Sequence, residues 1–97
     1  MIVVDKPTQM TPKRPDETVD YDFQWAKRLD PDNDTIVDGI VTCNDPSLIL
    51  GSTVVDTKTV KQWTSGGTDG VTYTLVNTIH TTLGRTLVRI MYVKVKA

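Results

Sequence analysis

The sequence has few of the residues that catalytic and cross-linked proteins depend on. Its 97 residues include one Cys, one His, one Phe and one Glu. The single thiol, Cys43, excludes an intrachain disulfide and a Cys-based zinc site. The length allows one small domain, which leaves no room for a cofactor domain beside a substrate domain.

Long apolar runs and an excess of one charge are also missing. No stretch approaches the ~18 apolar residues of a membrane-spanning helix. The first six residues lack the charged start and long apolar stretch of a signal peptide. The formal net charge of −1 argues against broad nucleic-acid binding. We therefore expect neither a membrane nor a nucleic acid as a partner.

What the sequence has in abundance is Thr and Val, with sixteen and thirteen copies. Side chains branched at Cβ favour strands over helices, so the composition predicts an all-β domain. Residues 20–97 contain short strand-like segments separated by turn signals. Residues 1–19 contain three Pro and no period, which predicts an extended N-terminal arm. Within this arm, Ile2, Val3 and Val4 could pair locally or add to the sheet edge of a neighbour.

About seven strands at this spacing predict an immunoglobulin-like sandwich of two sheets. The clearest strand covers residues 71–81, where apolar residues alternate with Thr and His. Tyr73, near its start, fits the Tyr corner of a penultimate immunoglobulin-type strand, whose hydroxyl bonds to nearby backbone. Glycines that supply positive φ are expected to form the turns on either side: Gly66, Gly67, Gly70 and Gly84.

The final predicted strand, residues 85–95, is apolar on both faces. One explanation is a bulge near Arg89 or a strand that crosses the core. The other is an outer face covered by a partner protein. With Trp63 as a surface anchor and the N-terminal apolar residues, this gives a predicted partner interface: Ile2, Val3, Val4, Trp63, Val88, Ile90 and Tyr92.

Two residue groups have some of the features of reactive sites. Asp30, Asp32 and Asp34 have the spacing of a calcium loop, but the closing bidentate ligand is absent, so a solvated turn is the default. Cys43 and His80 could pair as nucleophile and base, but no motif surrounds them and no third member is marked. We predict no catalytic, cofactor or metal site, and no enzyme activity.

The charge is distributed unevenly along the chain. Residues 1–57 have a net charge of −6, and residues 58–97 have a net charge of +5. A sandwich that interleaves both parts would cancel these charges in space. Alternatively, the protein has two surfaces of opposite sign, suited to head-to-tail contact between identical copies.

Several motifs resemble those of phage fiber-tail adaptor proteins. In the first part these are Pro-Asp-Glu at residues 15–17, Asp-Tyr-Asp-Phe-Gln-Trp at 20–25 with Leu29, and Asp-Thr-Ile at 34–36. Residues 63–70 match the family's W-x-S-G-G-T-x-G run. Tyr73, Asn77 and Ile79 then match Y-x-x-x-N-x-I, and residues 84–86 match G-R-T. Gln62 and Thr64 depart from the pattern, where more apolar residues are usual, and the N-terminal arm is longer.

The resemblance implies a small immunoglobulin-like virion protein without catalytic residues or cofactors. It implies a multi-copy subunit at the tail or head–tail region, synthesised in the host cytoplasm, on which fibers or other tail components dock. Its partners would be copies of itself in a ring and other tail, fiber or portal-region proteins. The alternative from another class is a carbohydrate- or host-surface-binding module, suggested by the Thr-rich strand faces and Trp63.

Overall fold

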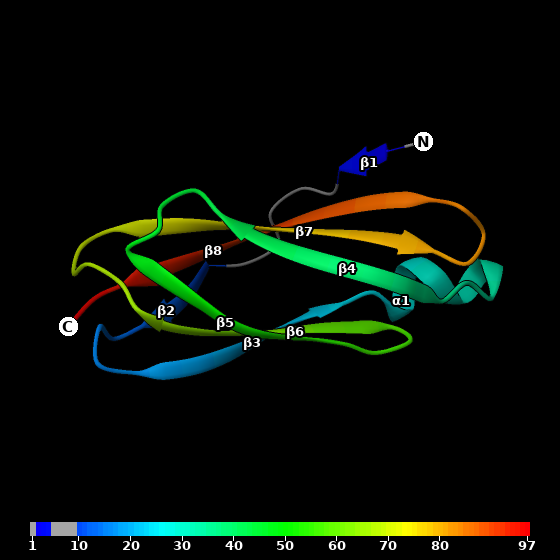
Figure 1. Ribbon diagram of the computed structural model, residues 1–97. Helices are drawn as coiled ribbons and strands as arrows, with labels where there is room; N and C mark the ends of the chain where they lie inside the picture. The colour runs from blue at the N-terminus through cyan, green and yellow to red at the C-terminus, as the bar shows by residue number, and fades with distance from the viewer. Residues whose placement is uncertain (1, 5–9) are drawn as a thin grey trace.

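Two β-sheets packed face to face form the protein (Figure 1). The computed structural model describes residues 2–4 and 10–97, with side chains described from Lys13 onward. In chain order the elements are β1 Ile2–Val4, β2 Met10–Lys13, β3 Thr18–Gln24, α1 Ala26–Leu29, the 3-10 turn η1 Asp30–Asp32, β4 Ile36–Cys43, β5 Leu48–Val55, β6 Thr59–Gly66, β7 Thr72–Thr81 and β8 Thr86–Val95.

The larger sheet has an antiparallel centre of β4, β7 and β8, and the smaller sheet has the order β3-β6-β5. The predicted all-β fold and two-sheet sandwich are therefore confirmed. The immunoglobulin-like relationship and the boundary between residues 19 and 20 stay predictions. The described residues form eight strands rather than about seven, because β1 and β2 both pair in parallel with β8. Pro12 lies in β2, an edge strand, where its missing N–H costs no internal ladder bond.

Alternation along β7 gives the sandwich its inner surface. Tyr73, Leu75 and Ile79 are fully buried, whereas Thr72 and His80 are exposed. This is the alternation that the sequence predicts. The core also takes in residues from β3, α1, β4, β5, β6 and β8: Tyr21, Phe23, Trp25, Leu29, Ile36, Leu48, Val60, Leu87, Met91, Val93 and Val95.

Strand β8 keeps one register against β7 along its whole length, from Thr86 opposite His80 to Lys94 opposite Thr72. A bulge near Arg89 is therefore the wrong explanation for its two apolar faces. Arg89 has the inward parity, but its guanidinium carbon lies 4.1 Å from the Trp25 ring centroid. The same side chain donates a hydrogen bond to the Gln24 carbonyl. Stacking on an indole and binding a carbonyl explain a cation at this position.

A buried polar link connects the middle of the two sheets, and at one end Lys13 Nζ of β2 also donates to the Gly66 carbonyl of β6 at 2.7 Å. The indole Nε1 of Trp25, which follows β3, donates to Asn77 Oδ1 of β7 at 2.8 Å. The Asn77 amide then donates to the Ile40 carbonyl of β4 at 3.0 Å. Trp25 and Asn77 are fully buried. Each therefore provides the hydrogen-bond partner of the other, and a buried polar group without a partner would lower the stability of the fold.

The turn between β6 and β7 depends on glycine and on Tyr73. Gly66, Gly67 and Gly70 have φ values of 70°, 99° and 85°. The Thr68 N–H donates to Tyr73 Oη at 2.8 Å, and Ser47 Oγ lies 2.5 Å from the same oxygen. Burial alone would raise the pKa of Tyr73, but these hydrogen bonds outweigh it and lower that pKa below its usual value.

We expect Gly67→Ala to destabilise the protein more than Gly70→Ala. Both positions have positive φ, so each substitution carries a backbone strain of about 1 kcal/mol. At Gly67 the new Cβ would also lie 2.7 Å from Val95 Cγ2, whereas at Gly70 nothing lies within 4 Å. Overpacking of this kind adds about 1–3 kcal/mol. Urea denaturation of the two variants measures the difference, and equal midpoints would contradict it.

Candidate docking surfaces

The residues of the predicted partner interface lie on two different faces. Val88, Ile90 and Tyr92 point outward from β8 and are half-buried on the outer face of the larger sheet. Trp63 lies on the outer face of the smaller sheet and is 38% exposed. The structure therefore does not bring Trp63 together with Val88, Ile90 and Tyr92.

The N-terminal members of that interface lie beside β8. The backbones of Ile2, Val3 and Val4 pair in parallel with Thr86, Leu87 and Val88. Their side chains lie outside the described part of the structure. Of the two predicted arrangements, the structure has the local one, in which this segment pairs with its own chain.

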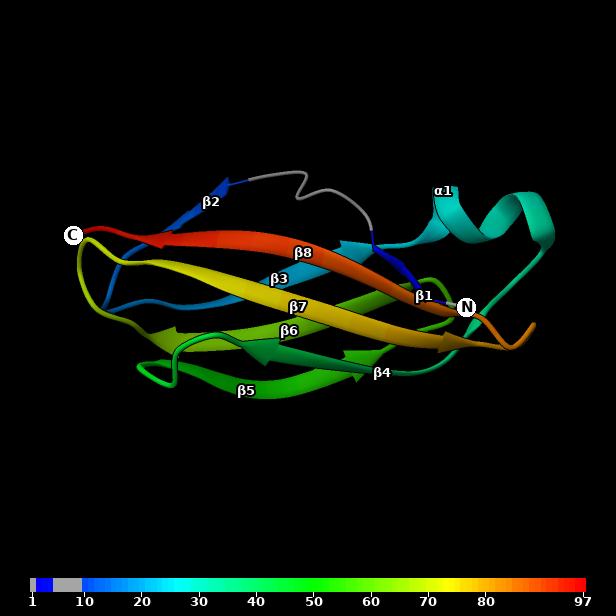
Figure 2. The same cartoon turned by 90° about the horizontal axis from the view of Figure 1, so that it is seen from above.

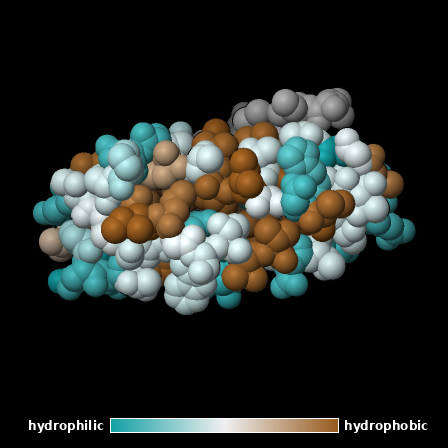
Figure 3. Space-filling model, viewed as in Figure 1, coloured by the Kyte–Doolittle hydropathy of each residue, from teal (hydrophilic) through white to brown (hydrophobic). Residues whose placement is uncertain are grey.

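Further exposed apolar side chains lie along β4 and β5, which run side by side, and brown patches separated by polar residues mark this region in Figure 3. The sequence reasoning missed them. These residues are between 38% and 62% exposed: Val37, Ile40, Ile49, Val54 and Val55. A signal for them was present in the sequence, because both segments have apolar residues on both strand faces, as the final strand does.

Strands β4 and β5 are the last in their sheets' order. Each is eight residues long and has one register irregularity, between Ile36 and Asp38 in β4 and between Leu50 and Thr53 in β5. Bulges at edges are one way in which proteins protect free strands from unwanted pairing. The exposed branched apolar side chains have the opposite effect, because they favour contact with another surface.

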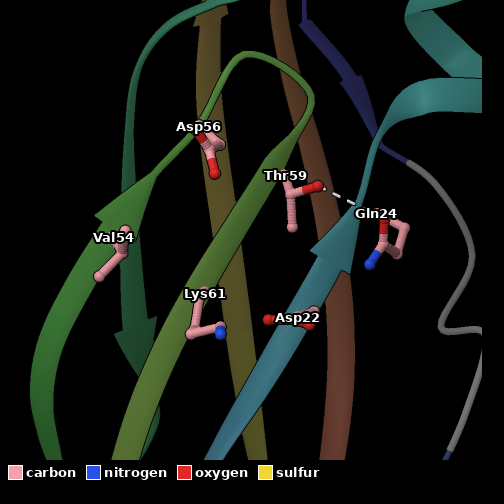
Figure 4. Close-up of a pocket in the computed structure, with 6 residues that line it drawn as sticks. All are labelled: Asp22, Gln24, Val54, Asp56, Thr59 and Lys61. Carbon is pink, nitrogen blue, oxygen red and sulfur yellow. Dashed lines mark hydrogen bonds between the residues drawn. The ribbon is translucent and has the colours of Figure 1, made fainter.

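A shallow polar pocket opens on the outer face of the smaller sheet (Figure 4). Its volume is about 280 Å³, and it is lined by Asp22, Gln24, Val54, Asp56, Thr59 and Lys61. Lys61 Nζ lies 3.5 Å from Asp20 Oδ2 beside it. Thr59 Oγ1 lies 3.4 Å from Gln24 Oε1 across two strands. The lining offers hydrogen-bond donors and acceptors, but contains neither Cys nor His.

The three aspartates with calcium-like spacing bind the protein's own cations. Asp34 is fully buried, and its carboxylate accepts bonds from Arg85 Nε at 3.0 Å and Nη2 at 2.8 Å. Asp32 binds the same guanidinium at 3.0 Å, and Asp30 binds Lys58. Among the residues that the structure describes, no group of three or more His, Cys, Asp or Glu side chains is placed to hold a metal ion.

Burial alone would raise the pKa of Asp34. The hydrogen bonds from Thr81, Arg85 and two backbone N–H groups outweigh that effect and lower the pKa to about 2. The carboxylate therefore stays ionised in the folded protein and holds the α1–η1 region against the β7–β8 turn, where it also accepts the Leu83 N–H at 3.1 Å.

Cys43 and His80 do not meet. Cys43 lies opposite Leu75, and His80 lies opposite Asp38, five residue pairs along the same ladder. At about 3.4 Å per residue, that separation is about 17 Å. His80 Nδ1 instead lies 2.5 Å from Asp38 Oδ1, and the Cys43 thiol contacts the Asn44 side chain at 3.7 Å.

Ion pairs connect the acidic and basic parts of the chain. Three basic side chains after residue 57 bind carboxylates that precede it. The pairs are Lys58 with Asp30, Lys61 with Asp20, and Arg85 with both Asp32 and Asp34. Interleaving therefore cancels much of the asymmetry, and the charges left over lie elsewhere on the surface.

This combination of an all-β scaffold, a buried polar link and apolar surfaces on edge strands defines a small structural domain with surfaces suited to protein contacts. A family model described as podophage GP4 fiber-tail adaptor protein gp77 matches residues 13–94. The chain belongs to this family, which gives it the role of a structural adaptor of the phage tail.

A search of curated proteins returned no match. No helix among the described residues is long and apolar enough to cross a membrane.

Replacing Asp34 by Ala is expected to cost about 3 kcal/mol of unfolding free energy, because it leaves the Arg85 guanidinium and two N–H groups without their acceptor. Asp16→Ala is the matched control. Asp16 pairs with Arg14 at 3.2 Å on the exposed surface, where ion pairs contribute little. Thermal or urea unfolding measures both variants, and equal losses would contradict the assignment.

The contribution of Asp34 is expected to depend on pH. A carboxyl whose pKa is lower in the folded than in the unfolded state stabilises the protein above its unfolded pKa, near 4. That stabilisation is lost as pH falls through about 2. The stability difference between the native protein and Asp34→Asn should therefore be constant near pH 7 and shrink between about pH 4 and pH 2. A difference that grows on acidification would overturn this account.

Proposed function

We propose that the chain is a non-enzymatic, multi-copy subunit of the virion at the tail or head–tail region. In this role it docks tail fibers or other tail components, and its partners are copies of itself, fiber proteins and portal-region proteins. It is synthesised in the host cytoplasm and incorporated during assembly. The observation that carries the proposal is the family match across residues 13–94.

The surface chemistry supports a docking role. Exposed apolar side chains on β4 and β5 are held on antiparallel ladders, and Ile36 and Leu48 anchor these two strands in the core. Such side chains lose little conformational freedom on binding, because the backbone that carries them is already ordered. The only Cys and the only His lie far apart on one ladder, which argues against a nucleophile–base pair.

The direct test is to purify particles and locate the chain in them. We expect several copies per particle by quantitative mass spectrometry and density at the tail or head–tail region by imaging. Particles assembled without the chain should package DNA and lack fibers. Virions that contain no copy, or that keep all their fibers without it, would contradict the proposal.

The alternative, a module that binds carbohydrate or a host surface, depends on Trp63. This aromatic side chain is 38% exposed beside Lys61, which lines the polar pocket. A glycan array with the native chain and with Trp63→Ala tests it, and Leu83→Ala is the control because Leu83 is 60% exposed in the β7–β8 turn. Binding lost only in Trp63→Ala would favour this alternative over the adaptor role, and absence of binding would count against it.

A further inference from the structure

The outer face of the larger sheet is apolar in its middle. In Figure 2 this sheet is seen face on, with β8, β7 and β4 side by side. Tyr73, Leu75 and Ile79 of β7 are buried in the core, so the residues between them point outward, and their cross-strand partners point the same way. The outward apolar residues of the three strands form what we name the central patch: Ile40, Val76, Val88, Ile90 and Tyr92.

The strand registers make the central patch continuous across the sheet. Val76 lies opposite Ile90 of β8. In the next outward row, Thr78 lies opposite both Ile40 of β4 and Val88 of β8. Ile40 is 60% exposed, and the other members of the patch are half-buried. Apolar surface that is continuous over several strands favours contact with another surface.

Charge on this face is confined to its two ends. Among the residues of β4, β7 and β8 that point to this side, Asp38 and its partner His80 lie at one end, and Lys94 lies at the other, opposite Thr72. His80 and Thr72 are eight positions apart along β7. At about 3.4 Å per residue, the acid and the base are therefore about 27 Å apart along the strands.

This distribution of charge makes the face complementary to a second copy of itself. When two copies are stacked with their strands antiparallel, the Lys94 end of each copy meets the Asp38 end of the other, so the attraction occurs twice. Stacking with the strands parallel would bring Lys94 against Lys94, which repels. The charges therefore select one of the two possible orientations.

The outer face of the smaller sheet does not have this property. Asp20, Asp22 and Lys61 lie in the middle of that face, on the paired strands β3 and β6. Two such faces pressed together would take these charged groups out of water, and the cost of that desolvation opposes the contact. The larger sheet has its apolar residues where the smaller sheet has charges, which favours the larger sheet as the contact between copies.

We propose that two copies of this chain pack through the outer faces of their larger sheets, related by a twofold axis that crosses the strands. The inference rests on the proposed multi-copy function and adds the surface through which two copies meet. Strands of ten residues and a width of four strands give a face of about 34 by 19 Å, or about 650 Å² before side-chain relief is counted. A standard interface buries about 800 Å² per partner, so the face is large enough for a stable dimer.

The first experiment places a cation in the central patch of the full chain. Ile40→Lys and Ile90→Lys should each sediment as a monomer at about 0.5 mM protein, where the native chain should be a dimer and nothing larger. Val54→Lys is the matched control. Val54 is 48% exposed and points outward from the smaller sheet, opposite Lys61, so this variant should remain a dimer. Circular dichroism with thermal melting verifies that each variant folds.

The second experiment tests the orientation through the charges at the two ends. Lys94→Glu alone places two acids at each end of the dimer, and Asp38→Lys alone places two bases there. Each should lower the association constant about tenfold at about 50 mM salt. The double variant, and an equal mixture of the two single variants, should regain the native association constant because opposite charges meet again. Lys27→Glu reverses an exposed cation of α1 outside this face and should have no effect.

Three results would overturn the inference: a native chain that stays monomeric, a native chain that grows beyond a dimer, and central-patch variants that fold and still dimerise. Charge variants that are not rescued by the exchange of both charges would overturn the antiparallel orientation. A chain that is present in virions but never dimerises would overturn this contact and leave the adaptor function standing, whereas a chain that dimerises but is absent from virions would remove the function alone.

Discussion

The hydrogen bond from the Trp25 indole to Asn77 is the constraint on which the relative placement of the two sheets depends. Both groups are fully buried, and each is the other's partner. Asn77 extends the link to the Ile40 carbonyl, so the end of β3, the middle of β7 and the middle of β4 are connected by polar groups that water cannot satisfy. Sliding any of these strands by one residue would orphan a buried donor or acceptor.

That constraint also shapes the surface. Ile40 pairs with Thr78 on the outer face of the β4–β7 ladder, so its side chain points outward and is exposed. Arg89 covers the outer part of the Trp25 ring.

Strand positions and the inner face of β7 could be predicted from the sequence, because alternation of Tyr73, Leu75 and Ile79 with Thr has a direct physical meaning in a half-buried strand. The exposure of Val37 and Ile49 could not be predicted. It depends on which strands end each sheet, and alternation within a strand carries no information on its neighbours. Local pairing of Ile2–Val4 was one of two predicted alternatives, but its partner strand β8 and the pairing of β2 were not predicted, for the same reason.

The candidate surfaces, too, could be predicted only in part from the sequence. The apolar β8 row was identified correctly as an outer face, since residues of equal parity must share a side. These residues are separated from Trp63 because β8 and β6 belong to different sheets, and the sequence does not show which sheet each strand joins. The Asp34–Arg85 pair joins residues 51 positions apart, and no spacing rule connects an acidic loop to a cation in a distant turn.

The parallel pairing of β1 and β2 with β8 has a mechanical consequence. Tension between the N-terminal segment and the C-terminal end of β8 would act along the ladder, because the strands run in the same direction. Under such a load the ladder hydrogen bonds resist together in shear, rather than opening one after another as in a hairpin pulled from its ends. The fold is therefore expected to resist force best along the direction in which β1 and β2 run beside β8.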